Sequence, residues 1–185
     1  MLFAVDESGA LDKTNLSSWQ QQKVGNTDFS GSVFLFVSSN TSVFTIEKDG
    51  TLYRTNPATA VTVQVGEAGE MALVNACTMI GNDIYTTDIL GDLFRTSGNT
   101  GRADKILEDD FYNTSFLFSD EKNWVSGGVR WLYSIESDGS LYEINSQDGA
   151  WEKMGMTGDL VNTIAGTVLN GKLYTVNSDG SLFET

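Results

Sequence analysis

The sequence contains no histidine, one cysteine (Cys77) and one proline among its 185 residues. The lack of histidine excludes a Ser-His-Asp triad, and a single cysteine excludes a structural zinc site and an internal disulfide. Basic residues are also scarce, since 11 Lys and Arg stand against 25 Asp and Glu and give a formal net charge of −14. Nucleic acids and anionic membrane surfaces are recognised through clustered Lys and Arg. We therefore expect no nucleic-acid partner, no bound metal and no cofactor.

Long hydrophobic runs are missing too. The longest apolar run is Val33–Val37, which is far too short to cross a bilayer, so we expect no membrane insertion. Residues 1–6 lack the basic region and the long apolar stretch of a secretory signal peptide. Charged residues make up 19% of the chain, compared with about 25% in typical soluble domains. This composition favours an extracellular or cell-surface protein but assigns no compartment.

One short pattern occurs five times along the chain: an apolar-aromatic strand, a turn that ends in glycine, and a second short strand. The glycines that end the turns follow one another at steps of 41, 41, 48 and 41 residues. Apolar and polar residues alternate along both arms, and the turn glycine supplies a positive φ, so each copy is predicted to be a β-hairpin. The predicted hairpins cover residues 2–14, 43–55, 84–96, 132–144 and 173–185.

Further strands are predicted between the hairpins. A more uniformly apolar strand precedes each later hairpin, and we expect it to be buried on both faces. These strands are predicted at Val33–Val37, Met71–Met79 and Ile164–Leu169, and in the longer third repeat at either 116–118 or 124–125. The seven extra residues of that repeat indicate an enlarged loop within 109–130, where a ligand contact is plausible because insertions into repeats often lie on the binding face.

About four short strands in each repeat of about 41 residues are typical of a β-propeller blade. We therefore predict an all-β fold, with residues 1–185 forming one β-propeller domain of about five four-stranded antiparallel blades. The count is four complete repeats plus one extra hairpin. A β-sandwich and a β-solenoid are the alternatives. Open sheet edges would have to be covered by a homo-oligomer or by a missing segment, since proteins avoid exposed edges.

The order of elements at the start of the chain resembles the tachylectin-2-like propeller lectins. Trp19, Val24-Gly25, Phe29 and Phe34–Phe36 follow one another as in those repeats, and the resemblance covers about residues 1–56. It implies a five-bladed propeller that binds carbohydrate. The Gly-Gly-Trp corner and the Asn-Trp pair of the lectins are absent here, so their sugar-binding residues do not transfer. The hairpin pattern is also similar to generic PQQ-like and kelch-like propeller repeats.

Acidic residues recur in the turns, and Asp49, Asp138 and Asp179 each precede a turn glycine. Such carboxylates could accept hydrogen bonds from sugar hydroxyls or bind calcium, but aspartate is also what this turn prefers for its own conformation. A calcium site needs about three converging carboxylates, and each turn offers two at most. Turn chemistry is therefore the favoured interpretation.

Tryptophans are the second group of ligand-binding candidates. Trp19 and Trp151 head equivalent strands and could stack on a sugar ring, although blade-to-blade packing explains them as well. Trp124, Arg130 and Trp131 belong to the enlarged loop of the third repeat or lie beside it. We assign no catalytic residue, because the carboxylates are distributed by the repeat and no nucleophile motif occurs.

These observations favour a non-catalytic binding module, a lectin-like propeller with repeated weak sites whose partner is a glycan or a protein ligand. The alternative is an acidic scaffold for protein-protein interaction or assembly. A fragment of a propeller hydrolase is the third hypothesis.

Overall fold

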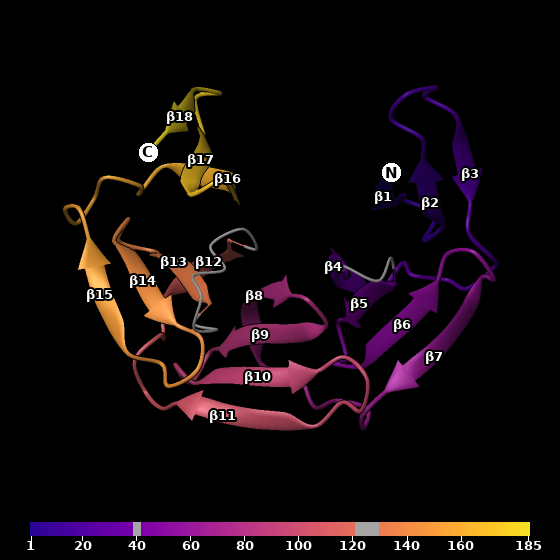
Figure 1. The fold of residues 1–185 in the computed structure, drawn as a ribbon, viewed down its shortest axis with the longest axis horizontal. Coiled ribbons are helices and arrows are strands. Elements are labelled where there is room, and N and C mark those ends of the chain that lie inside the picture. Colours follow the sequence, from indigo (N-terminus) through magenta and orange to yellow (C-terminus); the bar gives the residue numbers. More distant parts are fainter. Residues whose placement is uncertain (39–41, 121–129) are drawn as a thin grey trace. The chain divides into compact units, whose positions relative to one another are not determined.

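The structure is a computed structural model that describes residues 1–38, 42–120 and 130–185. In these residues, 18 strands form five antiparallel sheets, and no helix is present (Figure 1). The first sheet contains β1 (Leu2–Val5), β2 (Leu11–Thr14) and β3 (Gln21–Lys23). The second contains β4 (Ser32–Val37), β5 (Val43–Glu47), β6 (Leu52–Asn56) and β7 (Val61–Val65). The third contains β8 (Val74–Ile80), β9 (Asp83–Asp88), β10 (Leu93–Ser97) and β11 (Ala103–Leu107). The fourth contains β12 (Thr114–Ser119), β13 (Trp131–Glu136), β14 (Leu141–Asn145) and β15 (Trp151–Met154), and the fifth contains β16 (Thr163–Leu169), β17 (Lys172–Asn177) and β18 (Leu182–Glu184).

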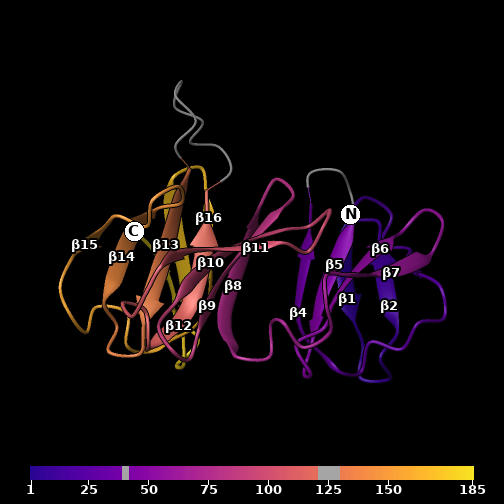
Figure 2. The same ribbon diagram turned by 90° about the horizontal axis from the view of Figure 1, so that it is seen from below.

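Each sheet is a meander, in which the strands lie side by side in chain order (Figures 1 and 2). This is the strand order of a β-propeller blade, so the predicted all-β propeller fold is confirmed. Three sheets have four strands, while the first lacks an innermost strand and the last lacks an outermost strand within the described residues. The five hairpins fall within about one residue of their predicted bounds, because glycine-ended turns and strand alternation are local signals.

Contacts divide the described chain into two compact units, each with its own buried residues. The first unit comprises Met1–Ala72 and Ser97–Arg102, and its core includes Leu11, Val24, Phe29 and Val43. The second unit comprises Leu73–Thr96 and Ala103–Thr185. Its core residues come from six strands of the third and fourth sheets and from one loop: Ala76, Ile80, Tyr85, Leu93, Phe111, Leu117, Leu132 and Ile144.

Two of the apolar strands that precede the hairpins, β4 and β16, are less buried than their sequence predicts. Val33 and Val37 of β4 are 48% and 43% exposed, and Ile164 of β16 is 58% exposed. These strands are the first in their sheets and therefore have one edge without a neighbouring strand. The strand beside them is buried instead, as in β5, where four consecutive residues are buried.

The structure also corrects one predicted strand and decides between the two alternatives in the third repeat. Residues 71–73 form a turn, and the strand of that repeat begins only at Val74. In the third repeat the apolar strand is β12, which includes residues 116–118. The alternative at 124–125 lies outside the described residues. The extra length of this repeat falls between β12 and β13, inside the predicted range of 109–130.

Successive sheets are joined by the same backbone hydrogen bond at the turn glycine. Within the first unit the Phe29 amide donates to the Gly9 carbonyl at 2.8 Å, and within the second the Phe111 amide donates to the Gly91 carbonyl at 2.9 Å. Leu160 makes the corresponding bond to Gly139 at 3.1 Å. Each turn therefore lies against the segment that leads into the next sheet, and this contact shapes the pockets described below.

Candidate functional site

A polar pocket of about 210 Å³ lies in the second unit, between the loop that follows β11 and the turn that joins β13 to β14. The hydrogen bond between Phe111 and Gly91 fixes the start of the loop, and the segment that follows it leads into β12. Aromatic rings and carboxylates share the lining, which consists of Asp110, Phe111, Tyr112, Asn113, Glu136, Ser137, Asp138, Tyr142 and Trp151. We call this the Trp151 pocket.

Trp151 is held at the rim of this pocket in a fixed orientation. Its indole Nε1 donates a hydrogen bond of 3.0 Å to Asp110 Oδ2, although the two residues are 41 positions apart in the sequence. Its ring meets the Tyr142 ring edge to face, with 5.2 Å between the centroids and 88° between the planes. The side chain remains 46% exposed. The pocket therefore presents a flat apolar surface that two neighbours hold in place.

Glu136 is the least solvated carboxylate of the pocket lining. Burial raises its pKa, and the negative charge of nearby Asp138 raises it further, while hydrogen bonds from hydroxyl groups lower it. One of these hydroxyls is Thr114 Oγ1, which donates to Glu136 Oε1 at 2.8 Å. Asp138 behaves differently, because the backbone amide of Ser140 donates to it at 2.9 Å and lowers its pKa.

A second pocket with an equivalent lining lies in the first unit, where its volume is about 420 Å³. Phe29, Glu47, Asp49 and Tyr53 occupy the repeat positions of Phe111, Glu136, Asp138 and Tyr142. The hydroxyl contact is also repeated, since Ser32 Oγ donates to Glu47 Oε1 as Thr114 does to Glu136. We call this the Tyr53 pocket.

The two pockets differ at their rims. The strand pairing that places Trp151 opposite Ile144 places Thr62 opposite Thr55, so Thr62 stands where the other pocket has its tryptophan. Lys48 lines the Tyr53 pocket at the repeat position of Ser137. In the sequence, the remaining three copies carry Asp12, Phe94 and Phe183 at the tyrosine position, and Asp6, Asp88 and Asn177 at the glutamate position. The combination of Phe, Glu and Tyr is thus confined to the two pockets.

The acidic turns have a clear structural role. Asp49 Oδ1 accepts the amide of Thr51 at 2.9 Å, and Asp179 Oδ1 accepts the amide of Ser181 at 2.9 Å, as Asp138 does with Ser140. These backbone bonds lower the pKa of each carboxyl group. Asp49 and Asp138 also line the two pockets, whereas Asp179 lines neither. Within residues 1–38, 42–120 and 130–185, no group of three or more Asp, Glu, Cys or His side chains could hold a metal ion.

The remaining predicted site residues lie away from the two pockets. Trp19 follows the turn after β2, has a φ of 55° and is 76% exposed, but it does not line the Tyr53 pocket. Trp131 begins β13 at the end opposite Glu136, and Arg130 donates from Nη1 to the Ile80 carbonyl at 3.4 Å. Trp124 lies outside the described residues. Of the predicted residues, the structure thus brings together only Trp151 and Asp138 in one pocket.

Sequence reasoning did not identify Tyr142, Tyr53 and Tyr112 as site residues. The first two belong to the Leu-Tyr pattern of the second hairpin arm, so they read as ordinary strand residues. A signal was nevertheless present, because only two copies of the repeat combine this tyrosine with a glutamate before the turn. Tyr112 is 51% exposed, and burial followed by the charge of Asp109 raises the pKa of its hydroxyl.

No helix long and apolar enough to span a membrane occurs in the part of the chain that the structure describes. No protein-family model matches the sequence, and no curated protein sequence matches it either. Solved structures do match. PorZ of Porphyromonas gingivalis, described as an essential surface component of the type-IX secretion system, is 14% identical with a TM-score of 0.65, and the match covers 99% of this chain and 25% of PorZ.

Virginiamycin B lyase from Staphylococcus aureus is 13% identical with a TM-score of 0.61, over 99% of this chain and 68% of the lyase. A catalytically inactive form of the lyase with quinupristin is 14% identical with a TM-score of 0.64 and the same coverage. The chain thus spans about a quarter of PorZ and about two thirds of the lyase. At this identity the likeness shows the fold alone: the chain has a β-propeller fold, and the narrower resemblance to tachylectin-2-like lectins is not established.

Proposed function

We propose that this protein is a non-catalytic carbohydrate-binding module whose principal site is the Trp151 pocket. The observation that carries the proposal is the orientation of Trp151, which Asp110 and Tyr142 hold beside the carboxylates of Glu136 and Asp138. Such a surface suits the apolar face of a sugar ring, and the carboxylates suit its hydroxyl groups as hydrogen-bond acceptors.

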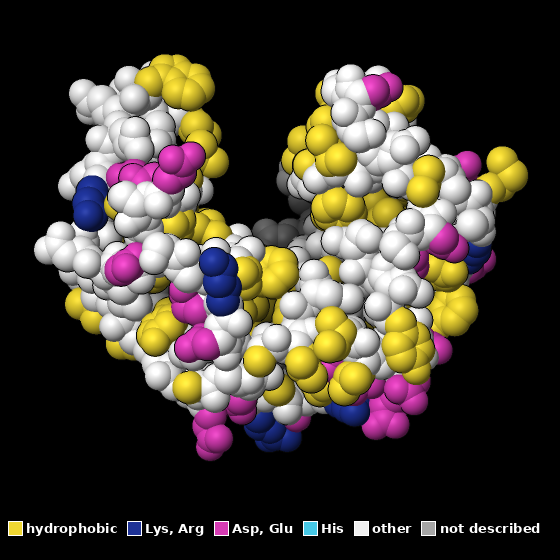
Figure 3. Space-filling view, turned by 180° about the vertical axis from the view of Figure 1, so that it is seen from behind, with side chains coloured by type: hydrophobic (Ala, Val, Ile, Leu, Met, Phe, Trp, Pro, Cys, Tyr) yellow, Lys and Arg dark blue, Asp and Glu magenta, His cyan; other side chains and the backbone are white. Residues whose placement is uncertain are grey.

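The largely uncharged surface of the molecule supports a polar, uncharged ligand. On the face drawn in Figure 3, backbone and uncharged polar side chains cover most of the area, and acidic side chains form separate small groups. The Tyr53 pocket repeats the Phe, Glu, Asp and Tyr lining without the tryptophan. It is therefore a second and weaker site of the same kind, and several weak sites gain affinity for a multivalent glycan.

Two observations support binding rather than catalysis. The Glu and Asp pair occurs in both pockets, as expected of a feature that belongs to the repeat. A catalytic pair of carboxylates is instead expected at a single place in the chain. The inactive form of virginiamycin B lyase has a histidine replaced by alanine, and this chain contains no histidine.

The test is a glycan array, followed by calorimetry with cellotriose, maltotriose, lactose and the N-acetylglucosamine trisaccharide, with and without calcium. We expect Trp151→Ala to weaken binding about tenfold or more, which corresponds to about 1.4 kcal/mol or more. Trp19→Ala is the matched control, because Trp19 is more exposed but lines neither pocket, and it should leave the affinity unchanged.

Two results would overturn the proposal. The first is the absence of binding to any glycan under both conditions. The second is salt-sensitive capture of basic proteins that no sugar competes with, which would favour an acidic interaction scaffold instead.

A further inference from the structure

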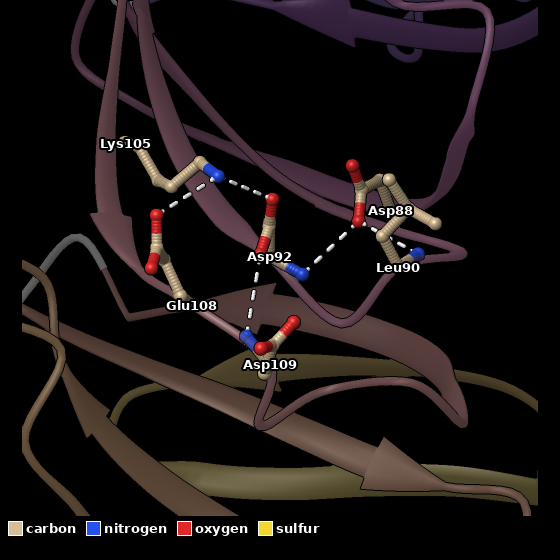
Figure 4. Close-up of polar contacts among 6 residues, drawn as sticks. All are labelled: Asp88, Leu90, Asp92, Lys105, Glu108 and Asp109. Atoms are coloured by element: carbon tan, nitrogen blue, oxygen red, sulfur yellow. Dashed lines mark hydrogen bonds and ion pairs between the residues drawn. The ribbon is translucent and has the colours of Figure 1, made fainter.

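A buried carboxylate of the third sheet connects the strands to the loop that lines the Trp151 pocket. Asp92 is 6% exposed and follows the turn glycine Gly91. Its Oδ2 lies 2.7 Å from Lys105 Nζ, and its Oδ1 accepts a hydrogen bond of 3.2 Å from the backbone amide of Asp109 (Figure 4). One oxygen is thus bound to a strand and the other to the loop, so the carboxylate bridges the two.

Lys105 is itself well fixed on β11. Its ammonium group also contacts Glu108 Oε1 at 3.2 Å (Figure 4). The same group lies 5.6 Å from the centroid of the Phe94 ring. The hydrogen bond from Lys105 lowers the pKa of Asp92, and the same bond raises the pKa of Lys105, so both groups stay charged at neutral pH.

The loop conformation requires an anchor at this place. Asp109 has a φ of 59°, in the left-handed region that residues other than glycine seldom adopt. The amide of Asp109 points to Asp92, and the amides of Asp110 and Phe111 both donate to the Gly91 carbonyl, at 3.1 and 2.9 Å. The loop therefore has three successive backbone donors bound to one turn.

The anchored loop carries the partner of the tryptophan. Asp110 is the next residue after Asp109, and its Oδ2 accepts the hydrogen bond from Trp151 Nε1. Tyr112 follows, with its ring against the Gly91 turn, and it lines the same pocket. A shift of the Asp109 backbone would move the Asp110 carboxylate away from the indole.

This arrangement occurs in one copy of the repeat. The residue after the turn glycine is Asp92 here, whereas the other four copies have Ala10, Thr51, Ser140 and Ser181. Hairpins also form in the two copies whose turns read Asp-Gly-Ser and in the copy with Thr51, all of which have a short residue at this position. A carboxylate is thus unnecessary for the hairpin itself, and its contacts point to the neighbouring loop.

We propose that Asp92, held by Lys105, is a positioning residue for the Trp151 pocket, because it fixes the 109–112 loop so that Asp110 can orient the indole of Trp151. The inference rests on the proposed function for its biological meaning. The positioning itself is a property of the free protein and can be measured without a ligand.

The test uses the full chain labelled with ¹⁵N, and the indole signal of Trp151 is assigned by its absence in Trp151→Phe. Asp92→Ser introduces the residue that two other copies of the repeat carry, so the hairpin is expected to fold. We expect the Trp151 indole proton to exchange with solvent about tenfold faster or more, and its chemical shift to move toward that of Asp110→Asn. Lys105→Met leaves Asp92 in place but removes its ion pair, so it should produce a smaller shift in the same direction, and Lys105→Arg should restore the signal.

The binding measurement then separates this inference from the proposed function. With the oligosaccharides named above, Asp92→Ser should weaken binding about tenfold, but it should have no further effect in the Trp151→Ala background. Binding at the Tyr53 pocket should not change. An unchanged indole signal in both Asp92→Ser and Lys105→Met would overturn the positioning role even if glycans bind. An indole shift without any glycan binding would support the positioning role and contradict the proposed function.

Discussion

At the scale of single residues, neighbouring carboxylates of one pocket differ in how they are solvated and bonded. Asp138 lies in its turn and accepts a backbone amide, which favours its charged form. Glu136, two residues earlier, is half-buried, and burial disfavours its charged form more than the Thr114 hydroxyl favours it. The folded protein therefore holds a proton on Glu136 to higher pH than the unfolded chain does.

This difference predicts how stability changes with pH. A carboxyl group with a raised pKa binds more protons in the folded state, so its contribution to stability falls as the pH rises from below the ordinary glutamate value through the raised value. Glu136→Gln removes this pH-dependent loss of stability and keeps an oxygen that can accept the hydrogen bond from the Thr114 hydroxyl. We expect the free energy of unfolding of the variant, relative to the parent, to increase from pH 4 to pH 7 in urea titrations.

A carboxylate with the opposite shift provides the control. The pKa of Asp179 is lowered by backbone and side-chain hydrogen bonds from Ser181, so its contribution to stability is present at neutral pH and disappears as the pH falls through the lowered value. The free energy of unfolding of Asp179→Asn, relative to that of the parent, should therefore be lower at pH 7 than at pH 3. Equal pH trends in the two variants would contradict the assignment for Glu136.

At the scale of the elements, the turn glycines perform two tasks that can be separated. Gly139 has a φ of 78°, and a Cβ placed on it would lie 2.3 Å from the Val161 nitrogen. Gly180 has a φ of 84° at the equivalent position, but a Cβ there would meet no atom within 4 Å. The first glycine therefore serves both backbone conformation and close packing, and the second serves conformation alone.

Alanine substitution should distinguish the two tasks. Gly180→Ala should cost about 1–2 kcal/mol for the left-handed conformation, and Gly139→Ala should cost about 1–3 kcal/mol more because of the steric clash. Urea unfolding at neutral pH measures both. Asparagine tolerates the left-handed conformation, so Gly180→Asn should recover most of the loss while Gly139→Asn should not. Similar losses in both positions would show that the packing at Gly139 is unimportant.

The same distinction explains what the sequence could predict. Hairpin position follows from strand alternation and a turn glycine, which are signals within about a dozen residues, and the five hairpins were therefore predictable. The Trp151 pocket depends on contacts between separate elements, such as the hydrogen bond between Trp151 and Asp110. The sequence marked Trp151 as a candidate and placed Asp110 only within the predicted loop of 109–130. The pairing of strands and the inter-sheet bond at Gly91 are what bring the two residues together.

At the scale of the whole molecule, the repeat produces two related sites rather than five. The glutamate, the turn aspartate and the strand tyrosine are combined in only two copies, and only one of these adds a tryptophan. Because the two copies have the same strand register at this position, Thr62 occupies the place of Trp151. The difference between the sites can then be transferred by a single substitution.

Thr62→Trp should convert the Tyr53 pocket into a second strong site. A tryptophan at this position would lie on the strand beside Tyr53, and Asp28, the counterpart of Asp110, lines the same pocket. The substitution removes the hydrogen bonds that Thr62 makes with Thr55 and Thr27, which costs about 1 kcal/mol of stability for each well-formed bond. Calorimetry with the best oligosaccharide should change from one strong site to two.

The combination with Trp151→Ala makes this prediction decisive, because the double variant should retain one strong site, now located in the first unit. Tyr53→Phe added to that variant should weaken the remaining site, while Tyr142→Phe should have no effect on it. If Thr62→Trp folds but adds no binding, the equivalence of the two linings does not extend to ligand recognition. The tryptophan would then act only together with the loop that Asp92 anchors, and a strong site would require that loop as well as the repeated Phe, Glu, Asp and Tyr lining.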